Sequence, residues 1–210
     1  MPQENPPSDR RSEIIDIATG LFLETGFAGT SISTVASACG ITKASLYHHF
    51  TGKDQLFAAC VTHGYRAALD EVKKIAHSDM DPEAKLRHAI DVLYEVTVMS
   101  SVGKMSPLIA EVSNAFPGVA RSFHQDYISP QEDLIQNIID EGVAKGVFRP
   151  CPPHLLMHVL MGPIVTLSLS RQMFGGLEDL DSHFPVEDLK NGHTDFLIQS
   201  LKDGNAVPIG

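Results

Sequence analysis

Cysteine is scarce in this chain, and its few copies form no recognisable site. Cys39, Cys60 and Cys151 are odd in number, lie far apart in the 210 residues and include no CxxC pair. This spacing argues against both a disulfide framework and a zinc site.

Uninterrupted hydrophobic runs are also short. None approaches the length of about 20 residues that spans a bilayer. The N-terminus, MPQENPPSDRR, is polar and rich in proline, unlike the apolar core of a secretory signal. With 43% hydrophobic and 20% charged residues, the composition is that of an ordinary globular protein. We expect a soluble, cytoplasmic protein that does not bind membranes.

Basic residues are outnumbered, with 16 Lys and Arg against 26 Asp and Glu and a net charge of −10. Such a total argues against a general affinity for nucleic acid. The acidic residues are unevenly placed, however. None lies between Glu24 and Asp54, a segment that holds Lys43 and Lys53 and follows the arginine pair 10–11. The sequence therefore predicts a locally cationic surface on the N-terminal quarter. It predicts a different role for the acidic remainder of the chain.

The apolar spacing is helical nearly throughout. No alternating strand pattern of useful length and no internal repeat is present, so we predict an all-α fold of roughly nine helices. Residues 1–8 are expected to be a disordered arm, and the first helix to begin near Ser8 and to end before Gly26. A helix is expected from about Phe116 to Lys145, which Pro130 should bend or interrupt, and Pro163 is expected to kink another.

The most specific pattern is SISTVASACGITKASLYHHFTGK, residues 31–53. Its first apolar residues recur every three or four positions, as one helix face requires, and Gly40 supplies the left-handed turn that ends the helix. Thr42 is placed to cap a second short helix with Leu46 buried. A helix, a glycine turn and a second capped helix form a helix-turn-helix, whose second helix enters a DNA major groove.

This segment and its flanks resemble the DNA-binding domain of the tetracycline-repressor (TetR) family. Ala44 departs from the family pattern, because many members have glycine there. The resemblance covers about residues 10–57, without a gap. The matching residues are Gly26-Phe27, Thr30-Ser31, Val35-Ala36, Gly40-Ile41-Thr42, Leu46-Tyr47, Phe50, Lys53 and Leu56.

The resemblance implies a domain order and a function. A helix-turn-helix DNA-binding domain is expected over residues 9–52, and a helical effector-binding and dimerisation domain over residues 53–204. The implied protein is not an enzyme and uses no cofactor. It is a homodimeric transcriptional repressor that a small apolar effector releases from a palindromic operator.

DNA contacts are expected at helix N-termini and on the exposed face of the second helix. Amide groups at a helix N-terminus point at phosphate oxygens, and the helix dipole favours the anion. Lysine, serine and methyl groups can read base edges in the major groove. By the resemblance, the DNA-binding residues are Thr30, Ser31, Thr42, Lys43, Ala44, Ser45, Tyr47, His48 and Lys53.

Large, adaptable side chains recur in the later helices. Methionine suits apolar pockets that accept varied ligands, although an ordinary core role is the alternative for each residue. The predicted effector pocket comprises Met99, Met105, Phe116, Phe123, Tyr127, Met157 and Met161.

A dimer follows from the geometry of DNA. One short recognition helix gives little specificity, so two are presented about 34–36 Å apart to meet successive turns of the duplex. Burial within one chain is the alternative that the sequence leaves open for the residues involved. The predicted dimer surface comprises Leu156, Val159, Leu160, Leu167, Leu189, Phe196, Leu197 and Leu201.

Metal binding and two other functions are alternatives to this interpretation. His154 and His158 have a spacing that can hold a metal, with His124 as an imaginable third ligand, but solvated surface is the simpler explanation. An enzyme on a helical bundle lacks any Glu-x-x-His, HExxH, GxSxG, GxGxxG or phosphate-loop motif. A helical interaction protein that has lost DNA binding is opposed by the intact residues of the second helix, Thr42 and Tyr47 among them.

Overall fold

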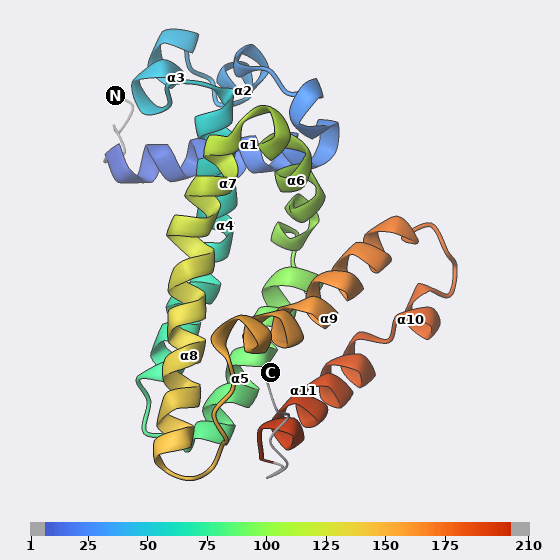
Figure 1. Ribbon diagram of the computed structural model, residues 1–210. Coiled ribbons are helices and arrows are strands. Elements are labelled where there is room, and N and C mark those ends of the chain that lie inside the picture. The colour runs from blue at the N-terminus through green and yellow to red at the C-terminus, as the bar shows by residue number, and fades with distance from the viewer. Residues whose placement is uncertain (1–6, 203–210) are drawn as a thin grey trace. The chain divides into compact units, whose positions relative to one another are not determined.

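The computed structural model describes residues 7–202, which contain helices and no strand (Figure 1). The predicted all-α fold class is confirmed. Most of the expected disordered arm, residues 1–6, lies outside the described residues, whereas Pro7 and Ser8 already belong to the first helix.

The chain divides into two compact units. The N-terminal unit comprises the residues up to Arg66 together with Met105–Tyr127, and the C-terminal unit comprises Ala67–Lys104 together with the residues from Ile128 onward. Helix α4 (Lys53–Ala76) therefore contributes its first turns to one unit and its last turns to the other. The segment 105–127, which the sequence placed in the second domain, packs as part of the N-terminal unit.

The N-terminal unit is built around the two short helices that the sequence predicts. Gly26 and Gly40 have φ angles of 72° and 64°, a left-handed conformation that glycine adopts without strain. Ser31 and Thr42 each accept a hydrogen bond from the amide three residues on, at 3.0 and 3.1 Å. Besides α4, the helices of this unit are α1 (Pro7–Gly29), α2 (Ile32–Ala38), α3 (Lys43–His49), α6 (Ser106–Ala115) and α7 (Pro117–Phe123), followed by the π-helical turn η3 (His124–Ile128).

Aromatic side chains form much of the core of the N-terminal unit. The ring centroids of Phe22, Phe27 and Phe57 lie 5.1 to 5.9 Å apart. Phe27 also contacts Phe116, at the end of α6, with a centroid separation of 5.5 Å. This aromatic contact gives a physical reason why the segment 105–127 joins the unit.

The C-terminal unit has one large aliphatic core. Ile90, Leu93 and Ile135 are fully buried in it. Pro130 stands at the second position of α8 (Ser129–Ala144), directly after the π-helical turn η3, so the helical run that begins with α7 is interrupted just before this proline. The helix that contains Pro163 continues through it. The elements are α5 (Pro82–Tyr94), the π-helical turn η1 (Glu95–Met99), the 3-10 turn η2 (Val102–Met105), α8 (Ser129–Ala144), α9 (Pro153–Met173), α10 (Leu180–His183) and α11 (Val186–Lys202).

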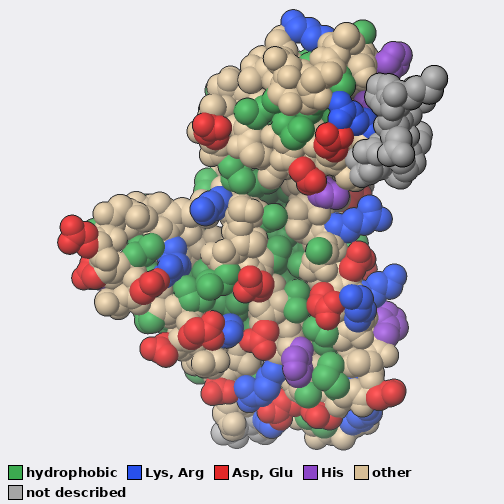
Figure 2. Space-filling model, turned by 180° about the vertical axis from the view of Figure 1, so that it is seen from behind, with side chains coloured by type: hydrophobic (Ala, Val, Ile, Leu, Met, Phe, Trp, Pro, Cys, Tyr) green, Lys and Arg blue, Asp and Glu red, His purple; other side chains and the backbone are tan. Residues whose placement is uncertain are grey.

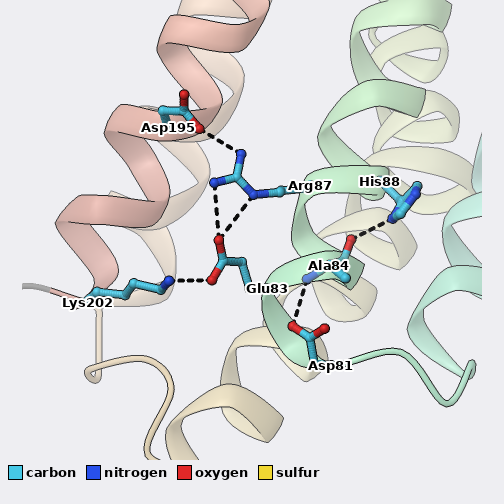
Figure 3. Close-up of polar contacts among 7 residues, drawn as sticks. All are labelled: Asp81, Glu83, Ala84, Arg87, His88, Asp195 and Lys202. Carbon is cyan, nitrogen blue, oxygen red and sulfur yellow. Dashed lines mark hydrogen bonds and ion pairs between the residues drawn. The ribbon is translucent and has the colours of Figure 1, made fainter.

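Ion pairs join α5 to α11 on the surface of the C-terminal unit. Figure 2 shows acidic and basic side chains intermingled over this unit, and Figure 3 shows how some of them meet. Arg87 points from α5 toward α11, where its Nη1 lies 2.7 Å from Oδ1 of Asp195. Glu83 accepts hydrogen bonds from Arg87 and from Lys202. The hydrogen bond from Lys202 is the main reason that the pKa of Glu83 is lowered.

Candidate nucleic-acid interface

Helix α3 presents a polar face to solvent because its apolar residues anchor it to the unit. Leu46 and the C-capping residue Phe50 are buried, with exposed fractions of 0% and 1%. The opposite side of the helix is open, and Tyr47 is 53% exposed. The exposed residues at and after the cap are Thr42, Lys43, Ala44, Tyr47 and His48, with Ser45 half-buried. These are six of the side chains that the sequence assigns to DNA, gathered on one short helix.

Thr30 and Ser31 are adjacent but face different surroundings. Ser31 is exposed at the start of α2. Thr30 is only 1% exposed, and its hydroxyl donates to the carbonyl oxygen of Gly26 at 2.8 Å. The predicted DNA contact by Thr30 therefore needs correction. Its side chain holds the glycine turn at the end of α1 and is not available to a phosphate.

Lys53 also differs from the sequence interpretation. Its Nζ donates to the carbonyl oxygens of Phe27 and Thr30, at 2.7 and 3.0 Å, and lies 4.1 Å from the centroid of the Phe27 ring. Two of its three N–H donors are thus used within the protein. These hydrogen bonds form an internal brace that fixes the connection between α1 and α2 to the start of α4, and the phosphate contact of Lys53 stays a prediction that would use the third donor.

Arg10 provides a second internal brace in the N-terminal unit. Its Nη2 donates to the carbonyl oxygen of Cys39 at 2.6 Å, at the turn between α2 and α3, and its Nη1 pairs with Glu13. The side chain of Lys43, by contrast, has no hydrogen bond or ion pair among residues 7–202. These two braces could not be predicted from local sequence patterns, because the acceptors lie 23 to 29 residues from the donors.

Both parts of the chain match known families. Residues 14–60 match the bacterial regulatory proteins of the tetR family, and residues 79–210 match the tetracyclin repressor-like C-terminal domain. The chain belongs to the TetR family. Members of this family are transcriptional regulators and not enzymes, so this chain is a TetR-family transcriptional regulator with an N-terminal helix-turn-helix.

Individual relatives agree with this assignment. The regulator is 29% identical over 155 residues to the HTH-type transcriptional repressor KstR2 of Rhodococcus jostii, covering 69% of this chain and 74% of that protein. Its fold is similar to FadR of Bacillus subtilis in complex with stearoyl-CoA, with a TM-score of 0.73 and 16% identity over 89% of this chain and 97% of the other. It is also similar to AibR in complex with isovaleryl coenzyme A and operator DNA, with a TM-score of 0.64 and 20% identity over 90% and 98% of the two chains.

The residues predicted to line the effector pocket of this TetR-family regulator fall into two groups. Met105, Phe116, Phe123 and Tyr127 lie in the N-terminal unit, where Met105 and Tyr127 are buried and Phe116 is 39% exposed. The others, Met99, Met157 and Met161, lie in the C-terminal unit.

The group in the N-terminal unit includes an aromatic cluster. The ring of Tyr127 lies 4.5 Å from that of Tyr65 and 5.4 Å from that of Phe123, between centroids. The Tyr127 hydroxyl is buried without a hydrogen-bond partner among the described residues, and burial raises its pKa. A buried orphan hydroxyl is costly, and such groups call for an explanation.

The C-terminal unit of the regulator contains a cleft that the sequence interpretation missed. It has a volume of about 600 Å³ and lies between α9 and α11, with Tyr94, Leu167, Phe184 and His193 among its lining residues. The Tyr94 hydroxyl lies 3.0 Å from Nδ1 of His193, whose Nε2 lies 3.1 Å from the carbonyl oxygen of Val159. The carbonyl can only accept, so Nε2 carries the proton. Burial lowers the pKa of His193.

The predicted dimer residues separate by helix face. Leu156, Leu160, Leu167, Leu197 and Leu201 are buried in the core of their own unit, so they are not free to contact a second copy, and Val159 is half-buried. Leu189 and Phe196 remain open, at 43% and 68% exposed. The exposed apolar surface of α9 to α11 consists of Leu155, Val165, Leu169, Met173, Phe174, Leu177, Leu189 and Phe196.

Helix α9 is long, apolar and only partly covered by the rest of its unit. By length and composition it could cross a membrane, with a mean hydropathy of 1.3 over 18 residues, although no single run in it is uninterrupted. Only 33% of that window is buried. One such helix is weak evidence for a membrane, because core helices of soluble proteins have the same composition.

The two histidines considered as metal ligands lie on an exposed face of α9. The Nδ1 of His158 lies 2.8 Å from the carbonyl oxygen of His154, so one ring nitrogen is engaged within the helix. Among residues 7–202, no group of three or more His, Cys, Asp or Glu side chains is placed to hold a metal ion.

Proposed function

We propose that this TetR-family regulator is a homodimeric repressor that binds a near-palindromic operator through α3 and leaves it when a small effector binds. The observation that carries the proposal is the polar face of α3, held outward by buried Leu46 and Phe50 and capped by Thr42. A short capped helix with lysine, tyrosine and histidine on its open side suits a major groove. The repressor KstR2 among its relatives supports the direction of regulation.

The exposed apolar surface of α9 to α11 supports the dimer. Monomeric proteins rarely leave contiguous apolar patches of more than a few hundred Å² uncovered. Met173 and Phe196 are 76% and 68% exposed, and most of α9 is apolar but uncovered. If a second copy packed the same surface against this one, the exposed apolar residues of both chains would be buried in a twofold-symmetric interface. A cytoplasmic location follows from this proposal, because covering α9 with protein removes the need for a lipid contact.

We infer that the effector is a coenzyme A thioester with an apolar acyl group. FadR and AibR, which share this fold, were solved with stearoyl-CoA and isovaleryl coenzyme A. The aromatic cluster around Tyr127 offers apolar contacts, and its orphan hydroxyl offers a hydrogen bond to a carbonyl oxygen. Such an effector releases DNA only if it binds the DNA-free conformation more tightly than the DNA-bound one.

The test begins with the operator. Bound fragments selected from the source genome give a candidate site, which is then titrated with the protein. Lys43→Ala and Tyr47→Ala are each expected to weaken binding by about tenfold or more, since each removes a contact with the duplex. Lys73→Ala is the matched control, because Lys73 is an exposed lysine of the C-terminal unit. Equal affinity of all four proteins would show that α3 does not read the DNA.

A further inference from the structure

The N-terminal unit contains a cleft of about 220 Å³ along one face of α4. Its floor is formed by the small side chains Ala58 and Ala59, which leave the helix surface open between α1 and α7. Thr62 lines the same face one turn further along, and Ser122 contributes from α7. The cleft therefore joins three helices of one unit and offers two hydroxyl groups.

The charged groups of this cleft are mainly cationic. Arg11 enters from α1 and Arg66 from α4, and neither forms an ion pair with a carboxylate among residues 7–202. The Arg11 guanidinium lies 4.9 Å from the centroid of the Phe50 ring, which positions it without neutralising it. His63 adds an imidazole, although its Nε2 lies 3.6 Å from a carboxylate oxygen of Asp16.

One acidic residue, Asp126, also lines the cleft. It is exposed and makes no ion pair with either arginine within 4 Å among the described residues. The arginines thus keep their N–H donors for an anion, and guanidinium groups bind phosphate oxygens in a two-pronged geometry. The full chain is acidic, with a net charge of −10, so a polyanion is attracted only where cations are locally unpaired.

We propose that this cleft binds the phosphate groups of a coenzyme A thioester. The inference rests on the proposed effector class and adds the site that holds the charged end of the molecule. The cleft is smaller than the roughly 300–1,000 Å³ of a site for a whole drug-sized ligand, which suits one charged group of a longer effector. A phosphate bound by Arg11 and Arg66 would link α1, the first helix of the DNA-binding domain, to α4 through the ligand.

Calorimetric titration of the full chain with coenzyme A, isovaleryl-CoA and stearoyl-CoA tests this site in the absence of DNA. Arg66→Ala is expected to weaken all three by roughly tenfold or more, because a hydrogen bond to a charged group is lost. Ala59→Glu places a carboxylate on the floor and is expected to abolish binding. Arg121→Ala is the matched control, since Arg121 is an exposed arginine of the same unit that does not line the cleft.

Two further arms separate the possible results. Inorganic pyrophosphate at millimolar concentration is expected to compete with coenzyme A, which identifies the phosphates as the bound groups. If Arg66→Ala and Ala59→Glu bind the thioesters as tightly as the unmodified protein, the cleft is not the site, and the proposed effector class stands. If the unmodified protein binds its operator but none of the three probes, both the cleft and the effector class are overturned, while the repressor proposal remains.

Discussion

The two units share one use of basic side chains and differ in another. Hydrogen bonds to distant backbone carbonyl oxygens occur in both, since Arg149 and Arg171 of the C-terminal unit donate to Ser200 and Phe184, but the ion pairs of Lys and Arg across helices belong, among the described residues, to the C-terminal unit. In the N-terminal unit, Lys53 and Arg10 donate to backbone carbonyl oxygens of connections that are distant in sequence. In the C-terminal unit, Arg87 and Lys202 pair with carboxylates across two neighbouring helices (Figure 3). The first arrangement fixes turns that no helix hydrogen bond could hold, whereas the second adds surface attraction between helices that a large core already packs.

This difference has a consequence for DNA binding. A local excess of Lys and Arg in the sequence suggests many phosphate contacts, yet two of these cations are engaged within the fold. Lys43 and Arg11 have no carboxylate partner within residues 7–202, and of these two only Lys43 lies on α3. Affinity for the operator should therefore depend less on the total local charge than on the shape of α3 and on having two copies of it.

The largest expected effect concerns the second copy. Phe196→Asp places a charge on the exposed apolar surface of α11, where burial against a partner would leave it unpaired. We expect the dimer to dissociate at micromolar concentration and operator affinity to fall by about a hundredfold, because two linked half-site contacts become independent. Sedimentation and operator titration measure the two effects. Asp195→Asn, one residue away, serves as the control and should stay dimeric. A Phe196→Asp protein that remains dimeric would place the interface elsewhere.

The next effect distinguishes a brace from a phosphate contact. Lys53→Met keeps the length of the side chain but removes its hydrogen bonds to Phe27 and Thr30, and should lower the free energy of unfolding by about 2 kcal/mol. Lys43→Met should leave stability unchanged but reduce the log-log salt slope of operator binding by about two for a dimer. Urea unfolding and salt titration of both variants give the comparison. A salt slope that falls for Lys53→Met, with no loss of stability, would make Lys53 a phosphate ligand.

A smaller effect tests the histidine of the C-terminal cleft. Burial lowers the folded-state pKa of His193, so the unfolded chain binds its proton more readily. The resulting stability is present above the unfolded pKa of about 6.5 and is lost as the pH falls below it. His193→Gln should reduce the dependence of the free energy of unfolding on pH in this range, which urea unfolding at several pH values measures. His88→Gln is the control, since His88 is an exposed histidine of the same unit. Equal slopes for the two variants would contradict the role of His193.

The smallest effect concerns the ion pairs of Figure 3. The lowered folded-state pKa of Glu83 means that its contribution is present above the unfolded pKa of about 4.3 and is lost as the pH falls through the folded value. Glu83→Gln should cost at most about 1 kcal/mol at neutral pH, because partly exposed pairs contribute little. Unfolding free energies at neutral pH and near pH 3 measure the difference, with Glu178→Gln, an exposed glutamate, as control. A larger loss at low pH than at neutral pH would contradict the assignment.

Much of the DNA-reading segment could be predicted from the sequence. The caps Ser31 and Thr42 and the turn at Gly40 act over three or four residues, so their signals are local. The predicted dimer residues show the limit of such reasoning. Helical periodicity identifies apolar positions on α9 and α11, but it does not tell which of two apolar faces packs against the core. Leu197, for example, is buried, whereas its neighbour Phe196 is exposed.

The sequence by itself determined the all-α class, the family and the helix-turn-helix, because spacing, caps and glycine turns depend on neighbours along the chain. Tertiary structure alone decided that Lys53 and Thr30 serve the fold, that residues 105–127 join the N-terminal unit and that Arg11 and Arg66 share a cleft. The physical reason is that a hydrogen bond or a burial depends on which surfaces meet in space. The acceptors of Lys53 lie 23 and 26 residues away, where no local pattern records them, and the burial of Thr30 likewise depends on the surrounding fold.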